Sequence, residues 1–138
     1  MEAALRLAPS LDDLARLYPW LDEVGAELPP ALLPRLHVVL EEAATNVAMH
    51  AYGPGEAGDI LVRLRTTPDS VELAIEDAGA AFDPTRAPPR DRSASLLDAP
   101  VGGWGLGLIR RYCPDISYAR HAGRNVLTLR FPLGVGQG

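Results

Sequence analysis

The sequence contains no lysine, a single cysteine and no long apolar run. Cys113 has no second cysteine to pair with, so an intramolecular disulfide is excluded, and no cluster of cysteine and histidine predicts a metal cage. No window approaches the roughly 18 uninterrupted apolar residues of a membrane-spanning helix, and the acidic start of the chain lacks the pattern of a signal peptide. We therefore expect a protein of the reducing cytoplasm with no membrane partner.

Positive charge is also scarce, since 13 arginines face 18 acidic residues and the net charge is -5. The general attraction to phosphate backbones that supports nucleic-acid binding is therefore missing, and we expect no direct nucleic-acid partner. With 138 residues, 47% of them hydrophobic, the chain is large enough to bury one core. We expect a single domain over residues 1–133 and a flexible, glycine-rich tail over residues 134–138.

The first half of the chain predicts a short strand and two helices. Apolar residues alternate over residues 5–9, which indicates an edge strand, and Ser10 is a suitable N-cap for a helix that reaches Gly25 and bends or breaks near Pro19. A longer helix is predicted over residues 30–52, ended by Gly53-Pro54-Gly55. Its expected buried stripe consists of Leu33, Leu36, Leu40, Ala43 and Val47.

The second half predicts strands around a long loop. Residues 60–64 and 71–75 alternate between apolar and polar and are joined through Thr67-Pro68-Asp69, which is typical of an antiparallel hairpin. Residues 84–105 are rich in proline and charge and predict a mobile loop. The remaining elements expected are a short helix over 106–112 and strands over 116–121 and 126–131 that turn at Gly123.

Three segments of this framework carry groups suited to chemistry, and the first lies on the longer helix. Glu42, Asn46 and His50 are four residues apart, so they project as one polar column beside the apolar stripe. A carboxylate there can orient a hydroxyl or a water molecule, and an amide oxygen can coordinate a hard cation such as Mg²⁺. Taken alone, the same spacing is more typical of a solvated helix face.

The second segment follows the hairpin, where Asp77 ends a predicted strand and Gly79 comes two residues later. A carboxylate at a strand end can accept a hydrogen bond from an exocyclic amine, and a residue without Cβ lets a flat ring approach the backbone. An ordinary Asp-x-Gly turn explains the same residues. We interpret Phe82, close by, as a core anchor rather than a stacking partner.

The third segment places Gly102, Gly103, Gly105 and Gly107 directly before the short helix. Free backbone amides beside the positive end of a helix dipole form a ready site for a phosphate chain. The segment is not a P-loop, because no Gly-Lys-Ser/Thr follows, and it is not a dinucleotide fingerprint, because a proline-rich loop rather than a strand precedes it.

The order of the three segments resembles the GHKL group of ATPases, which includes gyrase, histidine kinases and MutL. The match is best with the small bacterial anti-sigma-factor kinases of the RsbW and SpoIIAB type, and it covers nearly the whole chain. Residues 42–52 look like the N-box of that subfamily and residues 79–83 like its first glycine box. The resemblance implies an α/β sandwich, with a mixed, mostly antiparallel sheet and helices on one face. ATP would lie between sheet, helix and a lid over residues 84–105.

The resemblance also implies roles for individual residues. Glu42 would activate the acceptor hydroxyl, Asn46 would hold Mg²⁺, and Asp77 would bind the adenine amino group with Gly79 beneath the ring. Residues facing the phosphates would be Gly103, Gly105, Leu106 and Gly107. His50 would border the phosphates or cap the packing of its helix. Thr128 would reach adenine through water, or is an ordinary strand residue.

Three functions remain open at this point. The leading one is a serine/threonine kinase that transfers the γ-phosphate of Mg-ATP to an anti-sigma-factor antagonist of the STAS type and separately holds a sigma factor. The second is a nucleotide-gated binding module without turnover. The third is the ATP-binding part of a two-component histidine kinase, but His37 lies inside the nucleotide-domain helix with no acidic sequence neighbour, so we interpret it as structural. A homodimer through the first strand and helix is implied by the resemblance alone.

Overall fold

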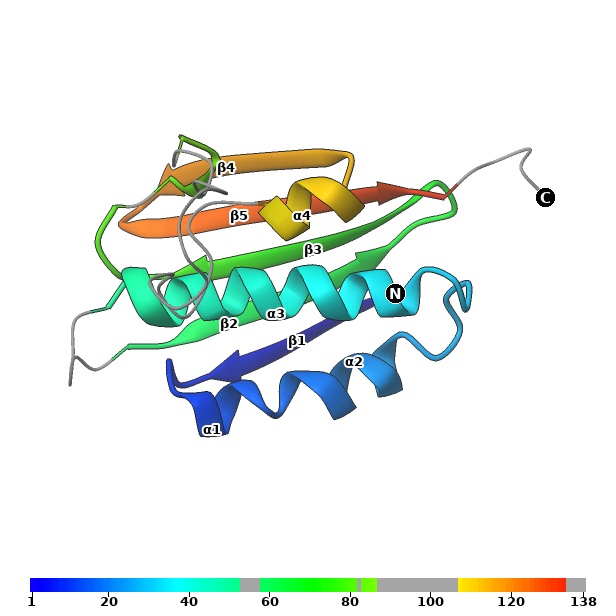
Figure 1. Cartoon of the computed structure of the whole chain (residues 1–138), viewed down its shortest axis with the longest axis horizontal. Helices are drawn as coiled ribbons and strands as arrows, with labels where there is room; N and C mark the ends of the chain where they lie inside the picture. The colour runs from blue at the N-terminus through cyan, green and yellow to red at the C-terminus, as the bar shows by residue number, and fades with distance from the viewer. Residues whose placement is uncertain (53–57, 82, 87–106, 134–138) are drawn as a thin grey trace, which may run out of the picture.

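The computed structural model describes residues 1–52, 58–81, 83–86 and 107–133. A five-stranded sheet in the order β1-β2-β3-β5-β4 is covered by the helices on one face (Figure 1). In chain order the elements are β1 (Glu2–Leu7), α1 (Leu11–Leu14), α2 (Leu17–Val24), α3 (Leu33–His50), β2 (Ile60–Thr66), β3 (Ser70–Asp77), the 3-10 turn η1 (Pro84–Arg86), α4 (Gly107–Tyr112), β4 (Asp115–His121) and β5 (Arg124–Pro132).

All four strand pairs of this sheet are antiparallel. The predicted hairpin is confirmed as β2 and β3, and the predicted final pair of strands as β4 and β5. The chain passes from β3 through η1 and α4 to β4 at the far edge, and β5 then returns between β4 and β3. The predicted α/β sandwich with helices on one face is confirmed, and among the described strands the sheet contains no parallel pair.

The core lies between the helix-facing side of the sheet and α3. Every second residue of the three central strands faces this core, as the two-residue period of a strand requires. The largest contributions come from Ile60, Val62, Leu64, Leu73, Ile75, Leu129 and Phe131 on the sheet and from Leu21, Leu36, Val39, Leu40 and Ile109 on the helices. None of the described helices is long and apolar enough to cross a membrane.

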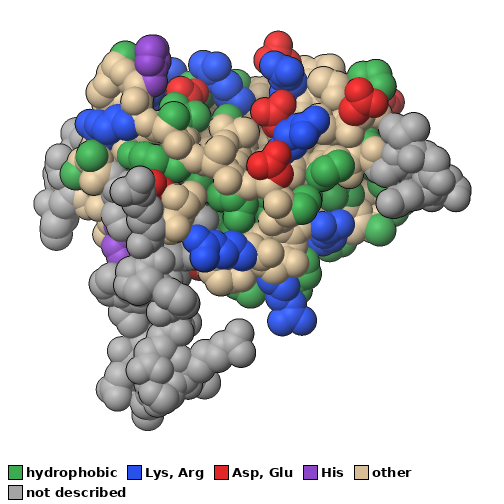
Figure 2. All heavy atoms as spheres, turned by 90° about the horizontal axis from the view of Figure 1, so that it is seen from above, with side chains coloured by type: hydrophobic (Ala, Val, Ile, Leu, Met, Phe, Trp, Pro, Cys, Tyr) green, Lys and Arg blue, Asp and Glu red, His purple; other side chains and the backbone are tan. Residues whose placement is uncertain are grey.

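The other face of the sheet is polar and mixes charges of both signs. One row across all five strands alternates in charge, in the order Glu2, Arg65, Glu72, Arg130 and Asp115. Within it, the Arg65 and Glu72 groups approach to 3.9 Å, as do the Arg130 and Asp115 groups. From the side that carries β4, arginines and acidic residues are visibly interspersed (Figure 2). This alternation offers no single-sign surface.

The first predicted helix is indeed broken, although the break precedes Pro19. Ser10 caps α1 as expected, since its hydroxyl accepts a hydrogen bond from the Asp13 amide at 3.2 Å. The chain then leaves the helix at Ala15 and starts α2 at Leu17, which places Pro19 in the first turn of α2. A proline has no amide hydrogen for the carbonyl four residues before it, so the interruption falls on the preceding turn.

Helix α3 begins three residues later than the sequence predicted and ends at His50. Pro34 occupies its first turn, where a missing amide hydrogen costs nothing. Three of the five stripe residues, Leu36, Leu40 and Ala43, are buried as expected, whereas Leu33 and Val47 are half-buried. The helix also buries one polar side chain, Asn46. Asparagine is mostly exposed in folded proteins, so its burial marks this side of α3 as a candidate site.

Candidate functional site

A small pocket lies between α3 and the ends of β3 and β5. Its walls are mostly apolar and its polar groups are few. The residues around it are Ala43, Asn46, Val47, Ala51, Ile75, Asp77, Pro84, Tyr118, Asn125 and Leu127. The pocket thus brings together two of the sequence-predicted residues, Asn46 and Asp77, that lie 31 positions apart in the chain.

The predicted polar column on α3 is present, but its three members differ in burial. Asn46 is only 4% exposed and lines the pocket, whereas Glu42 and His50 are half-buried and do not line it. Because one helical turn separates Glu42 from Asn46, Glu42 lies on the same side of α3, one turn nearer to the start of the helix. The helix therefore offers an amide in the wall of the pocket and a carboxylate one helical turn away.

Asp77 is the polar centre of the pocket. It ends β3, is 3% exposed, and its Oδ1 accepts hydrogen bonds from the Gly79 amide and from Nδ2 of Asn125, each at 2.9 Å. Its Oδ2 accepts no hydrogen bond from any described residue, so that oxygen can serve a ligand. Burial raises the pKa of Asp77 above its ordinary value, while the bonds from Asn125 and Gly79 and the charges of Arg124 and Arg120 oppose the rise.

Gly79 is required by packing that the sequence did not reveal. A Cβ on Gly79 would lie 2.1 Å from the carbonyl oxygen of Ala51, just past the end of α3, and 2.7 Å from its carbonyl carbon. The next residue, Ala80, donates its amide to that same oxygen at 3.0 Å. The glycine therefore lets β3 and α3 approach backbone to backbone, a role separate from the predicted one beneath a ring.

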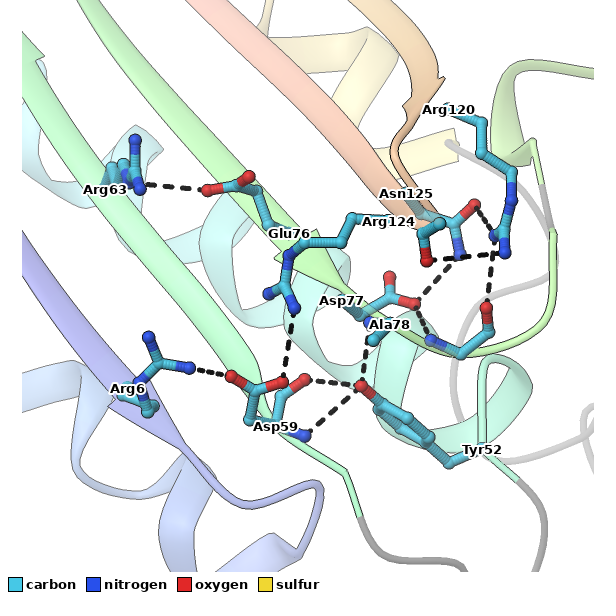
Figure 3. A network of polar contacts seen from close by, with 12 residues as sticks. Arg6, Tyr52, Asp59, Arg63, Glu76, Asp77, Ala78, Arg120, Arg124 and Asn125 are labelled. Carbon is cyan, nitrogen blue, oxygen red and sulfur yellow. Dashed lines mark hydrogen bonds and ion pairs between the residues drawn. The ribbon is translucent and has the colours of Figure 1, made fainter.

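Tyr52, just after α3, links the residue after β3 to the residue before β2 through its hydroxyl (Figure 3). Its hydroxyl accepts hydrogen bonds from the amides of Ala78 and Asp59, at 3.0 and 3.2 Å, and donates to the Asp59 carbonyl at 2.6 Å. The Asp59 carboxylate in turn pairs with Arg6 and lies 3.7 Å from Arg124. These contacts fix the start of β2 against the end of β3, next to Asp77.

Asn125 belongs to the pocket, although the sequence analysis did not select it. It lies directly opposite Asp77 in the pairing of β3 with β5 and is 4% exposed. One signal was available, because Asn125 shares the two-residue period of Leu127, Leu129 and Phe131, the buried side of β5. A polar residue in that register at the end of a strand indicates a site.

Thr128 is not brought to the pocket, which corrects its predicted position. It lies between the buried residues Leu127 and Leu129, so it faces the opposite, helix-free side of the sheet. Its strand neighbours there are Ala74 and Ser117. Among β5 residues, Asn125 and Leu127 border the pocket instead.

The predicted phosphate segment is described only at its end. Gly103, Gly105 and Leu106 lie outside the described residues, as do Phe82, most of the predicted lid and the predicted tail. Gly107 is the first residue of α4 and has open space where a Cβ would stand. The role of these residues toward phosphates stays a prediction.

Comparison with known proteins places this geometry in a family. Residues 7–131 match the histidine kinase-like ATPase domain, which is nearly the whole chain. The chain belongs to that family. Its membership implies an ATP site, which agrees with a pocket whose buried acceptor is Asp77.

Two curated relatives of this ATPase domain are named as kinases. The serine/threonine-protein kinase BtrW of Bordetella bronchiseptica is 44% identical over 94 residues, covering 68% of the chain and 66% of BtrW. The serine-protein kinase RsbW of Bacillus cereus is 29% identical over 100 residues, covering 70% of the chain and 62% of RsbW. The matched region thus spans somewhat less than two thirds of each relative.

A solved structure agrees in fold. The crystal structure of the RsbU and RsbW domains of Rv1364c from Mycobacterium tuberculosis superposes with a TM-score of 0.65 at 16% identity, covering 94% of the chain and 32% of that protein. At this identity the likeness concerns the fold alone. The predicted resemblance to GHKL ATPases of the RsbW type is confirmed by the family and the relatives together.

Proposed function

We propose that this ATPase domain binds Mg-ATP in the α3–β3–β5 pocket and transfers the γ-phosphate to a serine or threonine of a partner protein. The observation that carries the proposal is the buried Asp77 carboxylate, whose Oδ2 accepts nothing from the described residues, in a mostly apolar pocket. An exocyclic amine is the ligand group that such an acceptor selects. The apolar walls suit the faces of a purine ring.

Asn46 fits the role of Mg²⁺ ligand. Its amide reaches the pocket from α3, and an amide oxygen is a hard ligand of the kind Mg²⁺ accepts. Mg²⁺ is typically held by one or two protein oxygens plus substrate phosphates, so a single side chain on this wall is a sufficient protein share. When bound, the ion would neutralise phosphate charge, while Asn46 would fix where the phosphate chain leaves the adenine end.

Glu42 is proposed to orient the acceptor hydroxyl. It lies one helical turn from Asn46 and is half-buried, so it is more accessible to a protein substrate than the buried Asn46 is. Phosphoryl transfer depends mainly on positioning, so a carboxylate that accepts the hydroxyl hydrogen aligns the attacking oxygen. His50, a turn beyond Asn46, and Gly107, at the start of α4, are proposed neighbours of the phosphates together with Gly103, Gly105 and Leu106.

The proposed protein substrate is an anti-sigma-factor antagonist of the STAS type, with a sigma factor as a second partner. The support is the naming of the relatives as serine or serine/threonine kinases and the resemblance of the motifs. The histidine-kinase alternative is disfavoured by His37, which stacks on Tyr18 at 4.0 Å and bonds Asp22 at 2.8 Å, so it bridges α2 and α3. The acidic neighbour that the sequence did not show comes from α2.

The test is calorimetric titration with ATP, with and without Mg²⁺, followed by phosphotransfer to a purified STAS protein. We expect micromolar binding that Asp77→Ala abolishes and that becomes insensitive to Mg²⁺ in Asn46→Ala. Asp115→Asn, an exposed carboxylate on β4, is the matched control and should bind as the wild type does. Binding without phosphotransfer would instead support a nucleotide-gated binding module, and no binding at all would refute the ATP site.

A further inference from the structure

Asn125 lies beside the pocket, where it bonds the end of β3, the turn that follows β3, and β4 (Figure 3). Its Nδ2 donates to Asp77 Oδ1 and to the carbonyl of Ala80, both at 2.9 Å. One amide group thus spans the carboxylate and the backbone three residues beyond it. Because the side chain is 4% exposed, water offers these acceptors little competition.

The orientation of the Asn125 amide is fixed from its other side. Its Oδ1 accepts hydrogen bonds from the Tyr118 hydroxyl and from Nη1 of Arg120, the latter at 3.0 Å. Arg120 Nη1 also donates to the Gly79 carbonyl at 3.1 Å. A flipped amide would place its NH₂ against the Arg120 guanidinium, which can only donate, and its oxygen against two acceptors, so only one orientation satisfies all four partners.

We propose that Asn125, held by Tyr118 and Arg120, is a positioning residue that locks Asp77 to accept from a 6-amino purine and thereby selects adenine over guanine nucleotides. The inference rests on the proposed ATP site. With Oδ1 held by Asn125 and the Gly79 amide, the carboxylate cannot rotate about its last bond without breaking two hydrogen bonds. Oδ2 is then the fixed acceptor that faces the ligand.

Base selectivity follows from that fixed acceptor. The 6-amino group of adenine donates to Oδ2, whereas the 6-oxo group of guanine would set oxygen against oxygen. Relief would need the carboxylate to turn or shift, which Asn125 prevents. A site with a fixed buried polar partner rejects a mismatched ligand more strongly than an adaptable one, because the partner is left unpaired.

The same contacts bear on the charge of Asp77. Burial raises the pKa of its carboxyl, and the Asn125 hydrogen bond is the foremost of the effects that lower it. The charged groups that act on Asp77 are Arg124 and Arg120, whereas the phenols of Tyr118 and Tyr52 bond its neighbours Asn125 and Ala78. Removing Asn125 therefore moves the pKa of Asp77 further upward, and protonation of Asp77 then begins at a higher pH.

The first test needs no nucleotide and follows the Asp77 carboxyl by NMR titration of the ligand-free protein. Asn125→Ala should titrate Asp77 at higher pH than the wild type, and Tyr118→Phe, which only loosens the amide, should give a smaller shift of the same sign. Thr128→Ala is the matched control, since it alters the same strand on its opposite face. Unshifted titrations in both Asn125→Ala and Tyr118→Phe would overturn the positioning role.

The second test compares ATP with GTP by calorimetry in the same variants. Loss of a hydrogen bond to a charged group should weaken ATP binding about tenfold in Asn125→Ala, while GTP binding changes little, so discrimination falls. As the pH is lowered, Asn125→Ala should also lose ATP binding at a higher pH than the wild type does, because its Asp77 is protonated earlier. Discrimination unchanged in Asn125→Ala overturns the selectivity. A wild type that binds no nucleotide refutes the proposed function, and the NMR titration still decides whether Asn125 positions Asp77.

Discussion

Substitution of Gly79 by alanine separates two reasons for a glycine at this position. If the residue served only to let a purine ring approach the backbone, Gly79→Ala would fold normally and lose ATP. The structure instead places the missing Cβ 2.1 Å from the carbonyl oxygen of Ala51 and 2.8 Å from its Cβ. Contacts of that length do not occur, so the end of α3 or the end of β3 must move by roughly 1 Å or more.

The cost can be worked from those contacts. Overpacking of this kind costs about 1–3 kcal/mol, and the Ala80 amide bond to Ala51, 3.0 Å long, would be lost or stretched at about 1 kcal/mol more. The obstacle is backbone rather than a flexible side chain, which places the total near 3 kcal/mol. For a domain of 138 residues this corresponds to a melting temperature lowered by about 10 °C.

The assay is urea and thermal unfolding of the nucleotide-free protein, followed by circular dichroism. Gly107→Ala is the control, because nothing lies within 4 Å of the position that its Cβ would take and alanine favours a helix. That variant should be as stable as the wild type or slightly more so. A Gly79→Ala protein that melts with the wild type, yet binds no ATP, would refute the packing argument and restore the ring interpretation.

Four further changes test neighbouring parts of the structure. Asp77→Asn should abolish ATP binding and raise the stability at pH 7. Because burial raises the pKa of Asp77 in the folded state, the wild type loses stability as the pH rises from 3.8 through that raised pKa, whereas the uncharged asparagine loses none. Melting curves of both proteins measured against pH would show the difference. Tyr52→Phe should lower the free energy of unfolding by about 1–3 kcal/mol in urea titration, because two amides lose their acceptor. Arg6→Ala should change it by less than about 1 kcal/mol, since that ion pair is exposed, and an effect as large as that of Tyr52→Phe would contradict us. Glu42→Gln should slow phosphotransfer at least about 100-fold and leave the ATP affinity unchanged. The control is Glu41→Gln, which changes the exposed neighbouring residue and should leave the rate of phosphotransfer unchanged.

Local periodicity was enough to predict most of the fold. The alternation in residues 60–64 and 71–75 places most apolar side chains of each strand on one face, which must be the buried one. The structure shows this hairpin, and the residues on that face of both strands are buried as expected. The apolar stripe on α3 was predicted from its helical period, and three of its five residues, Leu36, Leu40 and Ala43, are buried as expected. The exact ends of the helices were predicted less well. At Pro19 the helix breaks one turn earlier than the proline itself, because the carbonyl four residues before a proline lacks an amide hydrogen to accept.

The sequence indicated those residues of the candidate site whose chemistry and local spacing form a motif. It did not indicate the residue that reaches the pocket only through the pairing of two strands. Asp77 could be selected from its strand-end position, but its partner Asn125 is 48 residues away and is identified only by the register of β3 with β5. Thr128 was chosen by resemblance, whereas its place between Leu127 and Leu129 puts it on the other face. Gly79 has its packing role through Ala51, which no sequence pattern links to it.

The segment from Asp77 to Ala80 is held by hydrogen bonds on two sides, and this bears on how the pocket would bind the proposed base. On the α3 side the Tyr52 hydroxyl binds the Ala78 amide and the Ala51 carbonyl binds the Ala80 amide. On the β5 side Asn125 binds Asp77 and the Ala80 carbonyl. A segment bonded on both sides has little freedom to adapt, so the cost of orienting the acceptor is met in folding rather than in binding. Substitutions that loosen either side should therefore weaken nucleotide affinity and lower stability together, whereas a change confined to Asp77 itself should separate the two.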